Sequence, residues 1–126
     1  MNDRPDATEL LAIARRTLLD ELLPRLPEEL RYNALMIANA MAIAAREHAA
    51  GEAGARFELA RLHAYYGEPQ AAPAGRELHA ALRDYNRRLA ADIRAGRGDD
   101  RAGLREHLAL TVADKLAITN PKALEN

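Results

Sequence analysis

Apolar residues recur every three or four positions over most of the chain, which is the spacing of one face of an α-helix. In residues 6–23 these positions include Leu11 and Leu18. Asp6 precedes the run and can accept hydrogen bonds from the free N–H groups of a first helical turn. Pro24 follows the run and lacks the N–H group that a helix interior requires. The pattern therefore predicts a first helix over residues 6–23.

A second helix is predicted from Pro27 to about Ala50, because proline suits the first turn of a helix. It contains the segment ALMIANAMAIAA, residues 34–45, in which no side chain is charged and only one is polar. This run is too short to cross a bilayer, which requires about 20 apolar residues. A helix that is apolar on every side is instead expected at the centre of a bundle. Because alanine fills little volume, we expect other helices, a second protomer or a ligand to supply the remaining bulk.

Three more helices are predicted after residue 51. A shorter helix ends at Gly67, a fourth opens at Pro73 and lasts to about Ala95, and a fifth is capped by Asp99 or Asp100 and closes near Asn120. In the fifth helix, apolar residues at steps of four form a stripe that consists of Leu104, Leu108, Val112 and Leu116.

No alternating apolar pattern of useful length predicts a β-strand. We therefore expect an all-α protein with a single domain over residues 1–126. Its architecture is predicted to be a compact antiparallel helical bundle of four principal helices plus one shorter helix.

Composition supports the helical prediction and excludes several classes of function. The chain has 28 Ala, one Phe and no Trp, and alanine is the best helix former. The formal net charge is −1, so no overall field attracts nucleic acid or an anionic membrane. The absence of Cys removes disulfides and thiolate metal ligands. The first residues lack the pattern of a secretory signal, so a cytoplasmic location is expected.

A line of polar residues runs along the predicted second helix. A spacing of seven residues places Tyr32, Asn39 and Arg46 on nearly one line of its surface. A buried carboxamide without partners costs about 1–3 kcal/mol, so we expect Asn39 to be buried and hydrogen-bonded to another helix. The simpler interpretation is that Asn39 fixes the register of the bundle. The functional alternative is that the three residues bind a ligand as the polar points of an apolar pocket.

The predicted fourth helix carries an arginine stripe, which consists of Arg76, Arg83, Arg87 and Arg94. At 100° per residue, the four positions fall within about 40° of one another. The opposite side is apolar and is expected to face the core through Leu78, Leu82, Tyr85, Leu89 and Ile93.

Two interpretations of the arginine stripe stay open. The simpler one is a solvated helix face. The functional one is a docking face for an acidic protein surface or a phosphate-bearing ligand, because guanidinium groups pair with carboxylate and phosphate in a bidentate manner. Nucleic acid is disfavoured, because the chain as a whole is not basic and aromatic residues do not interleave with the arginines.

The sequence contains no catalytic or cofactor motif. Its histidines lack the Glu-x-x-His and HExxH spacings of metal-binding helices, so we expect no metal site. Thr111, which has a titratable neighbour in Asp114, is interpreted as an ordinary helical residue. No cofactor is expected, and enzyme activity has no positive support, although sites can be assembled from residues that are distant in sequence.

Three segments resemble a bacterial family of small, uncharacterised, all-helical proteins. They are DRPDATELLAIAR near the start, RYNALMIANAMAIAARE in the second helix and ADKLAITNPKAL at the end. Positions that match the family pattern are Arg31, Asn39, Ala40, Arg46, Glu47, Lys115, Leu116, Asn120 and Pro121. The resemblance supplies no catalytic residues. It implies a genomic context, because such proteins tend to be encoded beside aminoglycoside-phosphotransferase-like and acyl-CoA-dehydrogenase-like genes.

Two functions follow as hypotheses, and an enzyme with an unrecognised site ranks behind both. The first is an accessory or protein-interaction module that docks to a kinase-like (phosphotransferase-like) or acyl-CoA-dehydrogenase-like partner. The second is a small-molecule binding protein, in which the alanine-rich second helix lines a pocket for an acyl-type group. We also expect a homodimer or a bound protein partner, because the chain has few bulky side chains to close a bundle around this helix.

Overall fold

The computed structural model describes residues 4–69 and 71–125. Over these residues the chain is all-helical, with five α-helices and no β-strand. The prediction of an all-α fold is therefore confirmed. The helices divide between two compact units, the first ending at Gly51 and the second beginning at Glu52. That the whole chain forms a single domain stays a prediction.

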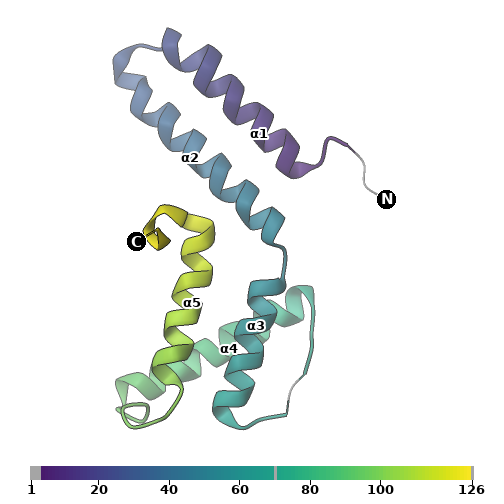
Figure 1. The fold of residues 1–126 in the computed structure, drawn as a ribbon, viewed down its shortest axis with the longest axis vertical. Helices are drawn as coiled ribbons and strands as arrows, with labels where there is room; N and C mark the ends of the chain where they lie inside the picture. The colour runs from purple at the N-terminus through teal and green to yellow at the C-terminus, as the bar shows by residue number, and fades with distance from the viewer. Residues whose placement is uncertain (1–3, 70, 126) are drawn as a thin grey trace. The chain divides into compact units, whose positions relative to one another are not determined.

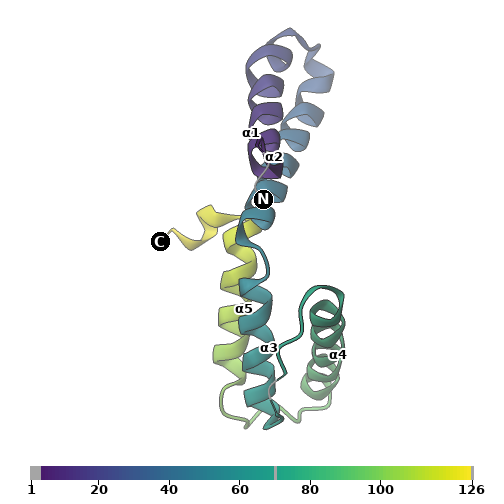
Figure 2. The same cartoon turned by 90° about the vertical axis from the view of Figure 1, so that its right-hand side faces the viewer.

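The first unit is a helical hairpin of α1 (Ala7–Thr17) and α2 (Glu28–Ala50). The two helices lie side by side and run in opposite directions (Figures 1 and 2). Asp6 caps α1 as predicted, because its Oδ1 accepts a hydrogen bond of 2.9 Å from the N–H group of Glu9.

The turn of the hairpin is itself helical. It consists of η1 (Leu18–Leu22), a π-helix, and η2 (Leu23–Arg25), a 3-10 helix. In η1 the N–H group of Leu23 donates to the carbonyl of Leu18, one residue further back than in an α-helix. The predicted first helix thus reaches its expected length, but its last turns are wider and then tighter than α-helical ones. Pro24 stands in η2, where the chain changes direction.

The second unit contains α3 (Ala53–Tyr66), α4 (Gly75–Arg94), α5 (Leu104–Thr119) and the short 3-10 helix η3 (Pro121–Leu124). Helix α3 packs against both α4 and α5, and Figure 2 shows it between them. The core of this unit is a cluster of leucines from α3 and α4, namely Leu59, Leu62, Leu78, Leu82 and Leu89. Three of the five predicted core residues of α4 belong to this cluster, whereas Tyr85 is half-buried and Ile93 is exposed.

Gly67 ends α3 as predicted. Its φ of 65° lies in the left-handed region that favours glycine. This conformation lets the N–H groups of Gly67 and Glu68 donate to the carbonyls of Ala64 and His63, at 3.2 and 2.9 Å.

Two helix starts differ from the prediction. Helix α4 begins at Gly75 rather than Pro73, and Oε1 of Glu52 accepts a hydrogen bond of 2.8 Å from the N–H group of Gly75. Helix α5 begins at Leu104, so neither Asp99 nor Asp100 is its cap. The reason is that residues 96–101 form consecutive turns instead of a helix start. In these turns the N–H group of Asp99 donates to the carbonyl of Gly96, and that of Arg101 to the carbonyl of Gly98.

None of the helices in the described part of the chain is both long enough and apolar enough to span a membrane.

Candidate functional site

One face of α2 packs against α1, and its contacts are made by small side chains. Ala34 and Ala38 are the buried residues of the hairpin among those described. Arg15 of α1 fixes the pairing, because its Nε donates a hydrogen bond of 3.1 Å to the carbonyl of Ala38. The fully buried positions of the hairpin are therefore small, while the larger side chains of Leu11, Leu19 and Met41 are half-buried.

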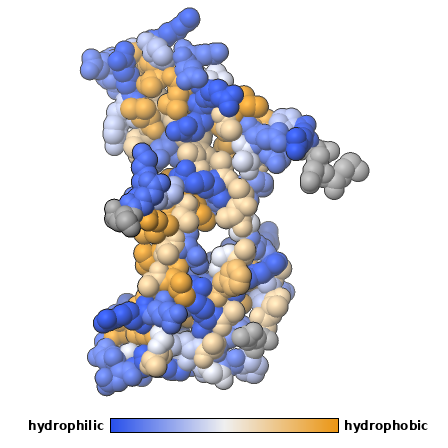
Figure 3. Space-filling model, viewed as in Figure 1, coloured by the Kyte–Doolittle hydropathy of each residue, from blue (hydrophilic) through white to orange (hydrophobic). Residues whose placement is uncertain are grey.

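Most large apolar side chains of the hairpin remain in contact with solvent. On α2, Leu35 and Ile37 are each 50% exposed, and Met36 is nearly as exposed. On α1, Leu10 and Ile13 are more than half exposed. Figure 3 shows hydrophobic surface over the hairpin among hydrophilic patches. Large apolar side chains that are exposed together on one part of a protein surface are typical of an interaction site.

The apolar side of α2 that points away from α1 is defined by five residues. At 100° per residue, they fall within an arc of about 120° that is centred far from Ala34 and Ala38. We call this arc the outer face of α2, and it consists of Met36, Ile37, Ala40, Ile43 and Ala44. Four of these residues are exposed and Ile43 is half-buried.

The three residues of α2 that were predicted to bind a ligand, Tyr32, Asn39 and Arg46, are not buried. Tyr32 is 70% exposed and Asn39 is exposed, so the prediction that Asn39 is buried and bonded to another helix is wrong. The physical reason is that α2 has one neighbour in its hairpin, on the side of Ala38, whereas Asn39 projects to another side. Whether Tyr32, Asn39 and Arg46 bind a ligand stays a prediction.

Arg46 alone of these three residues borders a hollow between α1 and α2. The hollow has a volume of about 430 Å³, and its apolar wall includes Leu11, Leu19 and Met41. Two further arginines line it, Arg15 and Arg16. Its lining therefore combines an apolar wall with three guanidinium groups and the carboxylate of Asp20.

The arginine stripe of α4 lies on the solvent side of the second unit. Arg76, Arg83, Arg87 and Arg94 are all exposed. In the described part of the chain none of the four pairs with an acidic side chain. The neighbouring Arg88 lies outside the stripe and behaves differently, because it pairs with Glu68 at 3.0 Å and its guanidinium lies 3.7 Å from the ring centre of Tyr66. The stripe is thus a set of solvated cations, which is compatible with either of its interpretations.

Helix α5 faces α3 with polar side chains, which sequence reasoning missed. Arg61 of α3 donates from Nε to Nδ1 of His107 at 3.4 Å and from Nη2 to Oγ1 of Thr111 at 3.1 Å. The same Nη2 lies 3.8 Å from Oδ2 of Asp114. Leu108 and Val112 of the predicted apolar stripe are exposed instead. The signal that could have found this contact is the spacing of residues 107, 111 and 114, which places three polar groups on one helical face.

The buried carboxylate of Glu58 extends this polar network from α3 and α5 to α4. Glu58 of α3 accepts a hydrogen bond of 3.0 Å from Nδ2 of Asn86 on α4. Its other oxygen lies 4.0 Å from Nζ of Lys115 on α5. A buried carboxylate requires such partners, because desolvation disfavours its charge. Glu58 therefore ties α4 and α5 to α3, which fixes the register of the three helices.

His107 is the buried histidine of the network. It is 4% exposed, and burial lowers its pKa, with a further lowering from the positive charge of Arg61. Because Nδ1 accepts a hydrogen bond, the imidazole is neutral in this arrangement. A neutral histidine held by an arginine is a structural partner here, and each side chain of the network already has a bonding partner.

Two tyrosines connect α3 and α4 through carboxylates. The hydroxyl of Tyr66 donates to Asp92, and that of Tyr85 donates to Glu68, both at 2.7 Å. Burial and the hydrogen bond to Asp92 raise the pKa of Tyr66 to about 12. The same hydrogen bonds hold the pKa values of Asp92 and Glu68 below their usual range. These pairs are fully bonded, so they stabilise the fold rather than offer a free acid or base.

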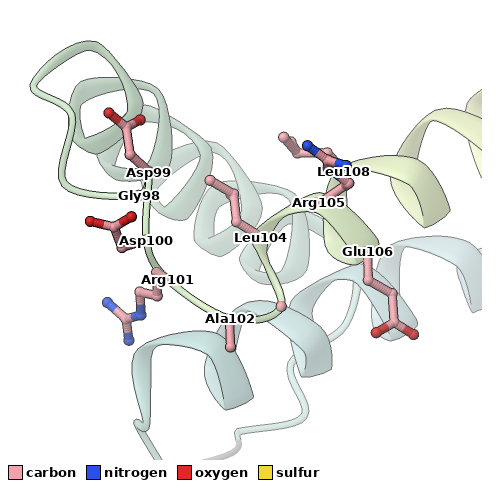
Figure 4. A pocket seen from close by; sticks show the side chains of 10 residues that line it. Gly98, Asp99, Asp100, Arg101, Ala102, Leu104, Arg105, Glu106 and Leu108 are labelled. Carbon is pink, nitrogen blue, oxygen red and sulfur yellow. The ribbon is translucent and has the colours of Figure 1, made fainter.

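A large hollow beside the start of α5 has no convergent polar groups. Its volume is about 850 Å³, and it is lined by the single segment from Gly98 to Leu108. Figure 4 shows the charged groups of Asp99, Asp100 and Arg101 pointing in different directions along this segment. Across residues 4–69 and 71–125, no three His, Asp or Glu side chains lie close enough to hold a metal ion.

Comparison with known proteins shows that the chain matches a protein family. Residues 24–123 match the family described as Domain of unknown function (DUF6285). This match bears out the resemblance to an uncharacterised family and includes α2, the arginine stripe and the polar network, but not α1. No curated protein and no solved structure matches the chain.

Proposed function

The chain belongs to the family called Domain of unknown function (DUF6285), and from that premise we propose that it is a protein-interaction module that pairs with a second copy of itself through the outer face of α2. The observation that carries the proposal is the exposure of apolar side chains on a helix that buries only two alanines against its partner helix. Ile37 and Met36 are each about half exposed. Burying the rest of such a side chain contributes about 1 kcal/mol.

A second copy fits the outer face because that face is self-complementary. If two α2 helices cross in opposite directions at Ala40, Met36 of one copy lies level with Ala44 of the other. Ile37 then lies level with Ile43. Large residues thus meet small ones around an alanine at the crossing point, which permits close approach of the two helices. Contacts of this kind are reciprocal, as a twofold homodimer requires.

The hairpin architecture supports the same partner. Two helical hairpins that pack face to face form a four-helix bundle, in which apolar side chains from both copies share one core. Electrostatics do not oppose this crossing, since Asn33 of one copy lies level with Glu47 of the other and no like charges meet in the outer face. In this proposal, the second copy supplies the side-chain bulk around α2 for which other helices, a second protomer or a ligand were the expected sources.

The test of this proposal is the molecular mass in solution of two matched variants. Ile37→Lys places a charge in the outer face, whereas Leu35→Lys places it on another side of α2, and both residues are 50% exposed. Light scattering should give about twice 13.9 kDa for the parent chain and for Leu35→Lys, and the monomer mass for Ile37→Lys. A monomeric parent chain at high concentration, or equal masses for the two variants, would contradict the proposal.

A protein partner beyond the second copy is proposed from the resemblance and from the arginine stripe. We propose that a phosphotransferase-like or acyl-CoA-dehydrogenase-like protein docks through an acidic surface on Arg76, Arg83, Arg87 and Arg94. The guanidinium groups of the stripe are exposed and pair with no acidic side chain among the described residues, which supports this proposal because they require no rearrangement to meet carboxylates.

A second candidate function rests on the hollow between α1 and α2. Its apolar wall and its excess of positive charge, three arginines (Arg15, Arg16 and Arg46) against the carboxylate of Asp20, suit an acyl-type ligand with an anionic head group. It opens on the side of α2 that faces α1, so binding there is compatible with pairing through the outer face. Titration with a medium-chain fatty acid tests it, since Arg16→Ala should weaken binding and Arg25→Ala, outside the hollow, should not. Equal affinities for the two variants would exclude this site.

A further inference from the structure

Two helix flanks of the second unit, one on α4 and one on α5, carry cations and no acidic residue. At 100° per residue, each flank is an arc of about 120°. The α4 flank contains the whole arginine stripe together with Asn86 and Ile93. The α5 flank contains Arg105 and Lys115, together with the apolar stripe of Leu104, Leu108, Val112 and Leu116. We call these two arcs the basic flanks.

The basic flanks meet at Glu58 of α3. Nδ2 of Asn86 donates a hydrogen bond of 3.0 Å to one oxygen of Glu58, and Nζ of Lys115 lies 4.0 Å from the other oxygen. Leu104, at the edge of the α5 flank, packs against the leucine cluster of α3 and α4. Figure 1 shows α4 crossing behind α5. The two flanks therefore border each other on one side of α3.

Large apolar side chains remain exposed on both basic flanks. Val112 is 54% exposed, Ile93 40% and Leu108 39%. Apolar side chains that are exposed together are typical of an interaction site. A partner of these flanks therefore needs apolar groups of its own.

The charge of the basic flanks defines the partner further. Their cations are the four residues of the arginine stripe, Arg105 and Lys115. The acidic residues of α4 and α5 all fall outside the two arcs, and they are Glu77, Asp84, Asp92, Glu106 and Asp114. Asp99 and Asp100 border Leu108 at the start of α5, but Arg101 and Arg105 line the same hollow and balance them. The partner must therefore supply carboxylates around its apolar groups.

An amphipathic helix with acidic residues beside its apolar stripe has this pattern. We propose that the basic flanks dock such a helix of a protein partner. Its apolar stripe packs on Ile93, Leu108 and Val112, and its carboxylates pair with the arginine stripe and Arg105. This inference rests on the proposed docking of a protein partner to the arginine stripe, and it names the element that the partner presents.

An anionic membrane is a different occupant with related chemistry. Insertion into a bilayer requires apolar side chains that reach past the charged groups of a helix. Ile93 and Leu108 are more than half buried, whereas the arginines of the stripe are exposed. The apolar side chains therefore do not project beyond the cations, which favours the helix.

The probe is a synthetic peptide of about 18 residues, long enough to form a helix. Leucines lie along one side of this helix, and glutamates lie on both edges of the leucine stripe. The control peptide carries glutamine in place of every glutamate. Binding to the full chain is followed by the fluorescence anisotropy of the labelled peptides. The glutamate peptide should bind about tenfold more tightly than its control at low salt, and the ratio should fall at high salt.

Two matched variants of α5 locate the binding surface. Val112→Glu places a carboxylate on the α5 flank, whereas Leu110→Glu places it on another side of the helix, and both residues are exposed. Val112→Glu should weaken binding of the glutamate peptide about tenfold or more, and Leu110→Glu should not. Circular dichroism should show the helical content of the parent chain in both. Ile37→Lys, which separates the proposed dimer, should keep the affinity of the parent chain.

Several results would overturn the inference. These are equal affinities of the two peptides at low salt, equal affinities of Val112→Glu and Leu110→Glu, or loss of binding in Ile37→Lys. Vesicles of phosphatidylcholine and phosphatidylserine that bind the parent chain but not Val112→Glu would assign the flanks to a membrane. A lower molecular mass for Val112→Glu than for the parent chain would assign them to a second copy.

One result separates this inference from the docking proposal on which it rests. If Arg83→Glu with Arg87→Glu weakens binding of the glutamate peptide but Val112→Glu does not, the arginine stripe still docks an acidic partner. The inference about the α5 flank and the amphipathic helix is then wrong. If neither variant weakens binding, the docking proposal is wrong as well.

Discussion

Arg61 donates a hydrogen bond from Nε to Nδ1 of the buried His107, and this bond joins α3 to α5 over 3.4 Å. It explains why the contact between these helices is polar while apolar residues of α5 face solvent. The bond requires a neutral imidazole, because a protonated His107 has no free acceptor at Nδ1. The pairing of the two helices is therefore sensitive to protonation of one residue.

The first prediction concerns the pH dependence of stability. The pKa of His107 in the folded chain lies below its ordinary value of 6.5, so the unfolded chain binds this proton more readily. Stability from the neutral imidazole is complete above about pH 6.5 and is lost as pH falls from there towards the lowered pKa. Melting temperatures at pH 7.5 and 5.5 should show this loss in the parent chain and a smaller loss in His107→Gln.

The control is His79→Gln, which alters an exposed histidine of the same unit. It should keep the pH dependence of the parent chain. Glu68 and Asp92 do not interfere, because their lowered pKa values place their titration below this pH range. If His107→Gln and His79→Gln lose the same stability between the two pH values, the role assigned to His107 is wrong.

A second prediction concerns close packing at the start of α5. A Cβ atom on Gly98 would lie 2.7 Å from Cδ2 of the Leu104 side chain. Because the contact is with the far end of a half-buried leucine side chain, Gly98→Ala should destabilise the fold by about 1 kcal/mol, the low end of the range of overpacked sites. Gly54→Ala in α3 meets no described atom within 4 Å and should stabilise the helix by about 0.5–1 kcal/mol. Urea denaturation of both variants measures the contrast, and a Gly98→Ala midpoint at or above that of the parent chain would refute the packing argument.

A third prediction separates the two interpretations of the arginine stripe. The double variant Arg83→Glu with Arg87→Glu should change stability by no more than about 0.5 kcal/mol per site, because both residues are exposed. If the stripe docks an acidic partner, association with a phosphotransferase-like or acyl-CoA-dehydrogenase-like protein should slow, most strongly at low salt. Arg88→Glu is the contrasting variant, since it breaks the pair with Glu68 and should lower stability instead. An unchanged association rate at low ionic strength would leave the stripe as a solvated face.

Local sequence signals predicted most of the helix boundaries. Asp6 and Gly67 act through bonds to neighbours within four residues, so a short sequence window contains the whole cause. The same approach failed at Asp99 and Asp100, because the preceding turns use the backbone groups that a cap would need. Residue types in a short sequence window therefore identify candidate helix caps, whereas the backbone conformation of the preceding residues determines which candidate caps the helix.

The candidate sites were harder to predict because they depend on which helices meet. The apolar run of α2 predicted a helix at the centre of a bundle, whereas in its hairpin α2 packs against α1 and leaves Leu35, Met36 and Ile37 about half exposed. The prediction for Asn39 was wrong because it assumed neighbours on every side, whereas the hairpin covers the side of Ala38. The pair of Arg61 and His107 is separated by 46 residues, so no spacing rule within one helix could reveal it.

The central claim is that two copies of the chain pair through the outer face of α2, and cysteine cross-linking at the predicted crossing point tests it most directly. The chain has no Cys, so a single introduced thiol can form a disulfide only between copies. Two Cys at position 40 meet the Cα separation of about 4.4–6.8 Å that a disulfide requires when α2 crosses its copy there. Ala40→Cys should therefore give a covalent dimer on mild oxidation, and Ala49→Cys, exposed on the same helix but far from the crossing point, should remain monomeric on a non-reducing gel. An Ala40→Cys chain that stays monomeric, or cross-links no faster than Ala49→Cys, would contradict the claim.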